Sequence, residues 1–180
     1  MGMDVYAYTN APRPTPESRV DKKGYTVPGT GDPQGTIPSK WFSAGSLDEF
    51  LAQDLDIVVV ATALTDETRG MIGKRQLELI GGEGRRRKGF LSNVARGPVV
   101  DTDALVEALE KGVIAGAALD VTDPEPLPEG HVLWRAPNVF ITPHVSWQST
   151  NLMSRAAGLL LENLERLDKG EPLLNVIKDR

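Results

Sequence analysis

Phe90-Leu91-Ser92-Asn93, followed by segments 101–111 and 114–119, decides the fold of this chain. The first and third segments are short apolar runs of the kind found in strands. In the middle segment apolar residues recur with the spacing of an amphipathic helix, and Gly112 closes it. A strand, a helix and a strand in this order form a parallel βαβ unit with a right-handed crossover.

The same alternation continues in both directions from this unit. Upstream, residues 56–62 form a continuous apolar run, typical of a strand covered on both faces, and residues 73–80 suit a helix. Residues 139–142 add a strand downstream, and residues 5–8 form a strand near the start of the chain. We therefore predict an α/β fold, a Rossmann-like parallel sheet with helices on both faces.

Two regions depart from this pattern. Residues 10–46 are rich in Pro, Gly, Ser and Thr without a sustained period, which predicts an irregular insertion. Residues 149–167 carry apolar side chains on one stripe of a long helix, a pattern typical of packing against a core. We predict a partial dinucleotide-binding domain over residues 1–147, and a C-terminal helix and tail over 148–180 that would return to a substrate domain.

Composition excludes several classes of protein. The net charge of −5 argues against a nucleic-acid surface, and we interpret the basic run 85–88 as a solvated loop. Without cysteine there is no disulfide or thiolate metal site, and no metal site is predicted. No run approaches the roughly 20 apolar residues of a membrane span, and no secretory signal opens the chain, so we expect a cytoplasmic protein without a membrane partner.

Three polar residues each follow the end of a predicted strand: Arg96, Glu125 and His144. Ligands of parallel sheets bind beyond the carboxyl ends of the strands, so we expect all three at one rim. Taken singly, Arg96 fits a structural turn and Glu125 fits an exposed acid in a proline-rich loop. Their convergence favours a site instead.

The chemistry of these residues suits a 2-keto or 2-hydroxy acid. The planar guanidinium of Arg96 matches a carboxylate, and Gly97 beside it would let the backbone approach a ligand closely. Glu125 would accept the ring N–H of His144, orienting the imidazole and favouring its protonated form. Protonated, His144 would donate to a keto oxygen during reduction; neutral, it would take the hydroxyl proton during oxidation.

Asp120 also stands at a predicted strand end. Its carboxylate could accept a hydrogen bond from the carboxamide of a nicotinamide. An aspartate that initiates a turn is an equally good interpretation of this position.

Four motifs follow one another in the chain: Ala61-Thr62-Ala63-Leu64-Thr65…Glu67-Thr68-Arg69-Gly70, Asn93…Arg96-Gly97, Ala118-Leu119-Asp120-Val121…Glu125-Pro126 and Thr142-Pro143-His144. In this order and spacing they resemble the D-isomer-specific 2-hydroxyacid dehydrogenases, which include glyoxylate/hydroxypyruvate reductases and phosphoglycerate dehydrogenases. The resemblance implies that Arg96 binds the substrate carboxylate and that His144 with Glu125 is the acid–base pair. It further implies a set of residues that line the dinucleotide: Thr62, Ala63, Val94, Ala95, Arg96, Asp120, His144 and Ser146.

The sequence departs from that family in its phosphate-binding elements. It contains no Gly-x-Gly-x-x-Gly, the loop that holds the pyrophosphate at a helix N-terminus. We therefore expect a truncated form, with the first strand, its helix and most of the substrate domain upstream of Met1. Thr9 and Asn10 stand where the family has an acid that bonds the ribose hydroxyls, and Arg13 could meet a 2′-phosphate. Thr9, Asn10 and Arg13 are thus predicted to bind the ribose end of the cofactor. The predicted cofactor is NADP or NAD, with NADP favoured.

The resemblance implies an NAD(P)-dependent oxidoreductase acting on the CH–OH group of a small 2-hydroxy acid, by reduction of a keto acid such as glyoxylate or hydroxypyruvate. On its own the chain should be weakly active or inactive, because half of the cleft is expected to be missing. The alternative is a non-catalytic dinucleotide-binding or dimerisation module derived from that family. The apolar stripe over 149–167, expected to be partly exposed, could then support a homodimer.

Overall fold

The structure is a computed structural model, and it describes residues 2–20, 25–27, 29–82, 84 and 87–176. Contacts divide the chain into two compact units. The sheet unit is Asp48–Trp147, and the flanking unit is Met1–Leu47 together with Gln148–Arg180. Arg85 and Arg86 lie outside the described residues, so the solvated basic loop stays a prediction, as do the domain boundaries.

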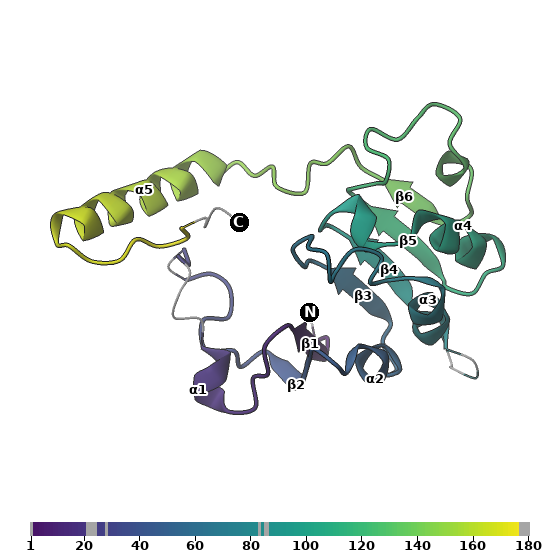
Figure 1. Ribbon diagram of the computed structural model, residues 1–180, viewed down its shortest axis with the longest axis horizontal. Helices are drawn as coiled ribbons and strands as arrows, with labels where there is room; N and C mark the ends of the chain where they lie inside the picture. Colours follow the sequence, from purple (N-terminus) through teal and green to yellow (C-terminus); the bar gives the residue numbers. More distant parts are fainter. Residues whose placement is uncertain (1, 21–24, 28, 83, 85–86, 177–180) are drawn as a thin grey trace. The chain divides into compact units, whose positions relative to one another are not determined.

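A four-stranded parallel sheet forms the centre of the sheet unit (Figure 1). Its strands are β3 (Ile57–Val60), β4 (Phe90–Asn93), β5 (Gly116–Leu119) and β6 (Val139–Ile141), and they lie side by side in chain order. The strands expected at these places are confirmed, with ends shifted by no more than about two residues, within the usual uncertainty of strand bounds.

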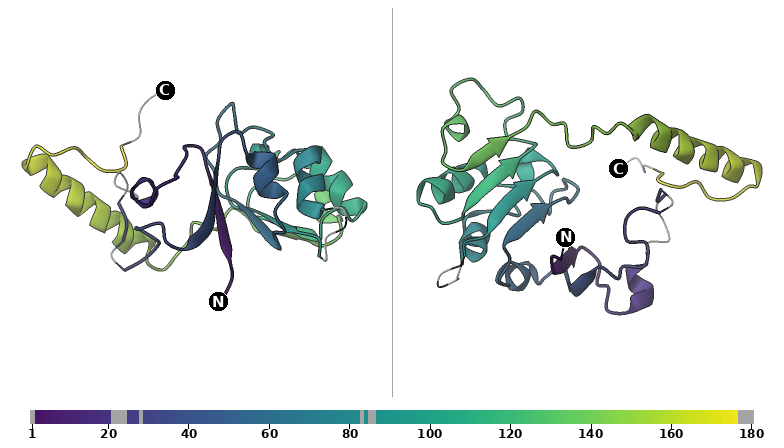
Figure 2. Two further views of the ribbon diagram at one scale, coloured as in Figure 1. Left: turned by 90° about the horizontal axis from the view of Figure 1, so that it is seen from below. Right: turned by 180° about the vertical axis from the view of Figure 1, so that it is seen from behind.

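Helices α3 (Lys74–Gly81) and α4 (Thr102–Glu110) connect the first three of these strands and lie on the same face of the sheet (Figures 1 and 2). Asp101 caps α4, because its side chain accepts a hydrogen bond from the backbone N–H of Ala104 at 3.0 Å. Short helical segments complete the unit: α2 (Leu47–Leu51), η1 (Gly97–Val99) and η2 (Val132–Trp134).

The two faces of this sheet differ in burial. Val58, Leu91 and Ala117 are in register and lie in the core, each no more than 5% exposed. In the next row, Val59 of β3 is 60% exposed and Phe140 of β6 is 66% exposed. The expectation that the 56–62 run is covered on both faces is therefore wrong, because α3 and α4 cover only one of them.

The flanking unit contains a second pair of parallel strands, β1 (Val5–Thr9) and β2 (Pro38–Ser43). A one-turn helix, α1 (Pro16–Arg19), lies between them in the sequence. The prediction of irregular structure throughout 10–46 is thus wrong at β2 and α1. Strand β2 is stabilised by hydrogen bonds to β1, a distant partner that the local composition of this segment does not indicate.

Helix α5 (Leu152–Asp168) confirms the long helix expected near the C-terminus. Its apolar stripe is exposed, since 52% of the surface of Leu164 and 79% of that of Met153 are accessible. Core packing, the usual meaning of such a stripe, is therefore wrong here, and the partial exposure also expected is confirmed. Among the described residues, no helix is both long and apolar enough to cross a membrane.

Candidate active site

The carboxyl ends of the four strands of the sheet unit lie level with one another. Val60 pairs with Asn93, Asn93 with Leu119, and Leu119 with Ile141, which are the last residues of β3 to β6. The loops that follow these strands therefore leave the sheet at one rim. Nine of the predicted site residues lie in these loops: Thr62, Ala63, Val94, Ala95, Arg96, Asp120, Glu125, His144 and Ser146.

Asn93 shapes the loop that carries Arg96, a role that the sequence did not indicate. Its side chain is 1% exposed, accepts from the backbone N–H of Ala95 at 3.0 Å and donates to the carbonyl of Arg96 at 3.1 Å. The guanidinium of Arg96 donates through Nη1 to the carbonyl of Ala95 at 2.6 Å. The sequence could have indicated this role, because Asn93 ends an apolar strand and an amide side chain buried there must find hydrogen-bond partners nearby.

Gly97 permits a close contact between two loops of the rim. A Cβ placed on it would lie 1.9 Å from the carbonyl oxygen of Thr122. The missing side chain therefore lets the loop after β4 approach the loop after β5, and the close approach of Gly97 to a ligand stays a prediction. Only a residue without a side chain permits this contact between two backbones.

Glu125 and His144 are in direct contact. The imidazole Nδ1 of His144 lies 2.6 Å from Oε1 of Glu125, and both side chains are about two-fifths exposed. The second carboxylate oxygen of Glu125 accepts from the backbone N–H of Thr122 at 3.3 Å. A carboxylate facing Nδ1 favours a proton on that nitrogen, which leaves Nε2 as the ring atom available to a ligand.

The backbone of His144 adopts a left-handed conformation with φ of 54°. Such a conformation costs about 1 to 3 kcal/mol for a residue other than glycine and persists where its surroundings fix it. Here the N–H of His144 donates to the carbonyl of Asp120 at 2.9 Å. The loop that presents the imidazole is thus anchored on the end of β5.

The side chain of Asp120 fixes the rest of that loop. It is 6% exposed and accepts from the hydroxyl of Thr142 at 2.5 Å and from the backbone N–H groups of Val145 at 2.9 Å and Ser146 at 2.8 Å. Burial by itself would raise the pKa of this carboxyl, but the hydrogen bonds from Thr142, Ser146 and Val145 outweigh it and hold the pKa far below its ordinary value. Asp120 is therefore charged at neutral pH.

The remaining predicted residues divide between the units. At the rim, Val94 is 38% exposed between the buried residues Asn93 and Ala95, and so presents an apolar surface. Thr9, Asn10 and Arg13 lie in the flanking unit, at and after the end of β1. Their part in cofactor binding stays a prediction.

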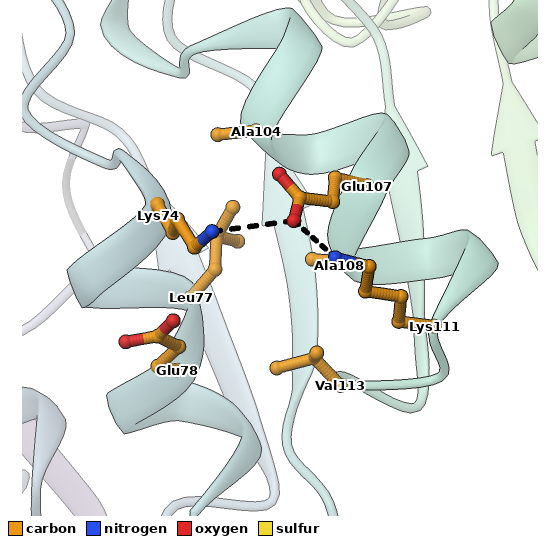
Figure 3. Close-up of a pocket in the computed structure, with 8 residues that line it drawn as sticks. All are labelled: Lys74, Leu77, Glu78, Ala104, Glu107, Ala108, Lys111 and Val113. Carbon is orange, nitrogen blue, oxygen red and sulfur yellow. Dashed lines mark hydrogen bonds and ion pairs between the residues drawn. The ribbon is translucent and has the colours of Figure 1, made fainter.

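Two hollows elsewhere in the sheet unit do not coincide with this site. One of about 140 Å³ lies between α3 and α4, where Glu107 accepts from Lys74 and Lys111 (Figure 3). This volume is below the roughly 300 Å³ of the smallest usual ligand pockets. A second, more open hollow of about 470 Å³ includes Arg69, Asp101 and His131 in its lining. Arg96, Glu125 and His144 line neither of them.

The rim suits one end of a nicotinamide dinucleotide. Val94 offers an apolar contact for a flat ring, and the neighbouring Asp120 carboxylate supplies negative charge beside polar main-chain groups. The glycine-rich loop that would hold a pyrophosphate is absent from the sequence. The residues present therefore fit the nicotinamide end and not the pyrophosphate.

A parallel α/β sheet whose connecting loops leave at its carboxyl rim defines a Rossmann-like fold, in which ligands bind at that rim. Residues 1–146 match the family described as "D-isomer specific 2-hydroxyacid dehydrogenase, NAD binding domain", and the chain belongs to that family. The resemblance inferred from the motifs is thereby confirmed. The match runs through residues 10–46, which the sequence had suggested to be an insertion.

Similar proteins include some that are named as reductases and dehydrogenases. A glyoxylate reductase of Thermofilum pendens is 40% identical over 147 residues, which cover 82% of this chain and 41% of the relative. A glycerate dehydrogenase of Methylorubrum extorquens is 39% identical over 128 residues, covering 70% of this chain and 39% of the relative. The chain thus spans about two-fifths of the length of these relatives.

Solved structures of the family confirm the fold class. The enzyme of Xanthobacter autotrophicus Py2, in complex with NADPH and MES, is 36% identical with a TM-score of 0.73, over 98% of this chain and 62% of that one. A probable 2-hydroxyacid dehydrogenase of Rhizobium etli CFN 42, in complex with NADP, HEPES and L(+)-tartaric acid, is 29% identical with a TM-score of 0.70. The latter likeness covers 98% of this chain and 48% of that one.

Proposed function

We propose that this chain is the cofactor-binding and proton-transferring part of an NAD(P)-dependent oxidoreductase that reduces a small 2-keto acid such as glyoxylate or hydroxypyruvate. The observation that carries the proposal is the 2.6 Å contact between His144 and Glu125 at the rim that also presents Arg96. Family membership and the printed activities of the relatives support it.

His144 is the proton donor in this proposal. Glu125 holds Nδ1, so the ring turns Nε2 toward the substrate oxygen, to which it delivers a proton as the carbonyl becomes an alcohol. In the reverse direction the neutral ring takes the hydroxyl proton. Asp120 keeps the loop of His144 in place through Val145 and Ser146.

Arg96 is the proposed anchor of the substrate carboxylate. Two parallel hydrogen bonds from its guanidinium would fix both the position and the orientation of the acid. This orientation matters because proton transfer requires the keto oxygen within hydrogen-bond distance of Nε2.

A nicotinamide dinucleotide, when bound, supplies the hydride. Thr62, Ala63, Val94 and Asp120 are the residues proposed to hold its nicotinamide end. The proposed cofactor is NADP in preference to NAD, because no acidic side chain follows β1 at Thr9 and Asn10.

The decisive test restores the length that the chain does not span. A chimera would join this chain to the portion of the Thermofilum pendens reductase that it does not cover, and glyoxylate reduction would be followed by NADPH absorbance. We expect turnover that His144→Ala lowers by at least about 100-fold. We also expect Arg96→Lys, which keeps the charge but not the fork, to raise KM and lower kcat/KM. A folded chimera without turnover, or full activity in His144→Ala, would contradict the proposal.

A non-catalytic dimerisation module is the second candidate, and the exposed stripe of α5 favours it. Sedimentation of the purified chain over a range of concentrations separates the two. Dimers that Leu164→Glu dissociates, combined with an inactive chimera, would favour the module. We also propose that the chain forms a homodimer, that it lies in the cytoplasm and that it has no nucleic-acid partner.

A further inference from the structure

The backbone carbonyl of His144 has a hydrogen-bond partner of its own. It accepts from the indole Nε1 of Trp147 at 2.8 Å, and both residues belong to the sheet unit. Trp147 is 56% exposed, so its N–H can also bond to water and does not need a protein acceptor. The bond back across three residues therefore serves the shape of the loop more than the needs of the indole.

The peptide unit between His144 and Val145 is held at both of its polar atoms. Its N–H, which belongs to Val145, donates to Oδ1 of Asp120 at 2.9 Å, and its carbonyl accepts from Trp147. The N–H and C=O of a trans peptide lie on opposite edges of one plane, so rotation of that plane breaks both bonds. Asp120 and Trp147 thus fix the same peptide unit from opposite edges.

This peptide unit controls how the imidazole is presented. The N–H of His144 donates to the carbonyl of Asp120 at 2.9 Å, which restricts φ, and the fixed peptide unit that follows restricts ψ. A histidine at a φ of 54° needs such restraints, because a residue with a side chain favours other backbone angles. Backbone angles in turn limit the rotamers open to the ring. Loss of a restraint on His144 therefore weakens the contact of its Nδ1 with Glu125.

Asp120 cannot supply the whole of this restraint. Its charged carboxylate only accepts hydrogen bonds, so it holds the N–H groups of the loop and not the carbonyl of His144. Among the residues that the structure describes, Trp147 is the one donor to that carbonyl. The two side chains are complementary, one as the acceptor and the other as the donor.

We propose that Trp147 is a positioning residue, whose indole N–H fixes the backbone of His144 so that Nδ1 stays on Glu125 and Nε2 is presented to a substrate. The inference rests on the proposed function for the use that is made of Nε2. It assigns the positioning of His144 to a side chain that contacts neither Glu125 nor Arg96 through a hydrogen bond in the described structure.

The first test is the tautomer of His144 in the ¹⁵N-labelled chain, recorded well above the ordinary histidine pKa of about 6.5. The chain has two histidines, and His131→Asn assigns their signals. The Nδ1 of His131 accepts from the N–H of Leu133 at 3.2 Å, so its neutral ring carries the proton on Nε2. His144 should show the opposite tautomer, with the proton on Nδ1, which makes His131 an internal reference.

Trp147→Phe keeps an aromatic ring but removes the N–H. We expect it to lower the ratio of the Nδ1–H to the Nε2–H tautomer of His144 by about fivefold, as for the loss of one hydrogen bond, and to leave His131 unchanged. Trp134→Phe is the matched control. Trp134 is 54% exposed, and its Nε1 donates to the carbonyl of Pro128 at 3.0 Å, so this variant removes a similar bond elsewhere in the unit.

The second test is the rate of glyoxylate reduction by the chimera. Trp147→Phe should lower kcat by about tenfold, because the proton donor is misplaced, and should leave KM within about twofold, because Arg96 lies on another loop. Trp147→His keeps a ring N–H and should retain more of the wild-type kcat. Trp134→Phe should have the wild-type kcat and KM.

The outcomes separate this role from the proposed function. An unchanged tautomer ratio in a folded Trp147→Phe chain, or an equal change in Trp134→Phe, would overturn the positioning role. So would an active chimera in which Trp147→Phe keeps the wild-type kcat. A changed ratio in a chain whose wild-type chimera does not reduce keto acids would sustain the role of Trp147 and overturn the oxidoreductase.

Discussion

The two units of this chain are stabilised in different ways. All the apolar side chains that form the core, from Leu51 to Leu133, belong to the sheet unit. In the described part of the flanking unit no apolar side chain is buried. Hydrogen bonds, cation–π contacts and one strand pair hold the flanking unit instead. Because burial of apolar surface dominates folding free energy, the sheet unit should unfold last.

The largest difference in loss of stability is expected between alanine substitutions of two glycines, one in each unit. Gly97→Ala places a methyl group 1.9 Å from the backbone oxygen of Thr122, and we expect the sheet unit to lose about 4 kcal/mol or more. Gly158→Ala in α5 meets only the side chain of Tyr25, whose hydroxyl oxygen lies 2.6 Å from the added Cβ and can move aside. Its helix should change by no more than about 1 kcal/mol. Amide hydrogen exchange in each unit measures the loss of stability in both variants. Similar losses would contradict the expected difference between the two units.

Leucine truncation compares the interiors of the units directly. Leu91 in β4 is fully buried, so Leu91→Ala should lower the free energy of unfolding by about 3 kcal/mol. Leu164 in α5 is 52% exposed, and Leu164→Ala should cost less than about 1 kcal/mol. Urea titration of the two variants, read by tryptophan fluorescence and circular dichroism, tests the difference. A larger loss in Leu164→Ala would show that α5 packs in a core of its own.

Two aspartates with similar partners sharpen the comparison. Asp120 in the sheet unit and Asp32 in the flanking unit each accept from two backbone N–H groups and a threonine hydroxyl. The hydrogen bonds lower the pKa of both carboxyls. We expect Asp120→Asn to cost about 2 kcal/mol, because Asp120 is buried, and Asp32→Asn to cost less.

The pH dependence of unfolding should follow from the same pKa shifts. A lowered pKa stabilises the folded state fully above the ordinary carboxyl pKa of about 4, and this stabilisation is lost as pH falls toward the folded pKa. Stability should therefore decline with acid below about pH 4 in the wild type and decline less in Asp120→Asn. An identical acid limb in the two proteins would refute this assignment.

The smallest effect on stability is expected at the contact between Glu125 and His144, the proposed acid–base pair. Glu125→Gln removes a half-exposed contact and should change the free energy of unfolding by less than about 1 kcal/mol, as should Glu162→Gln, which breaks the 2.9 Å pair with Arg166 in α5. Only Glu125→Gln should alter the ¹⁵N shifts of His144, which report the tautomer. Unchanged shifts would show that Glu125 does not orient the ring.

Local patterns were sufficient for much of the sheet unit. The apolar runs and helical periods placed β3 to β6, α3 and α4 within a few residues, because each element buries one side of a regular repeat. The placement of Glu125 and His144 at one rim followed from parallel strand order alone. By contrast, β2 was missed, since it lies in a segment dominated by loop-forming residues and pairs with residues 33 or 34 positions earlier in the chain.

The sequence by itself determined the order of strands and helices, the family, and the rim of the sheet from which the loops of Arg96, Glu125 and His144 leave. Tertiary structure alone decided that Gly97 meets the backbone of Thr122, that Asp120 holds the loop of His144, and that Arg13 and Arg19 share the ring of Trp41. The reason is physical. Periodicity reports how each segment faces the core, whereas these contacts join segments whose separation in space is set only when the loops close.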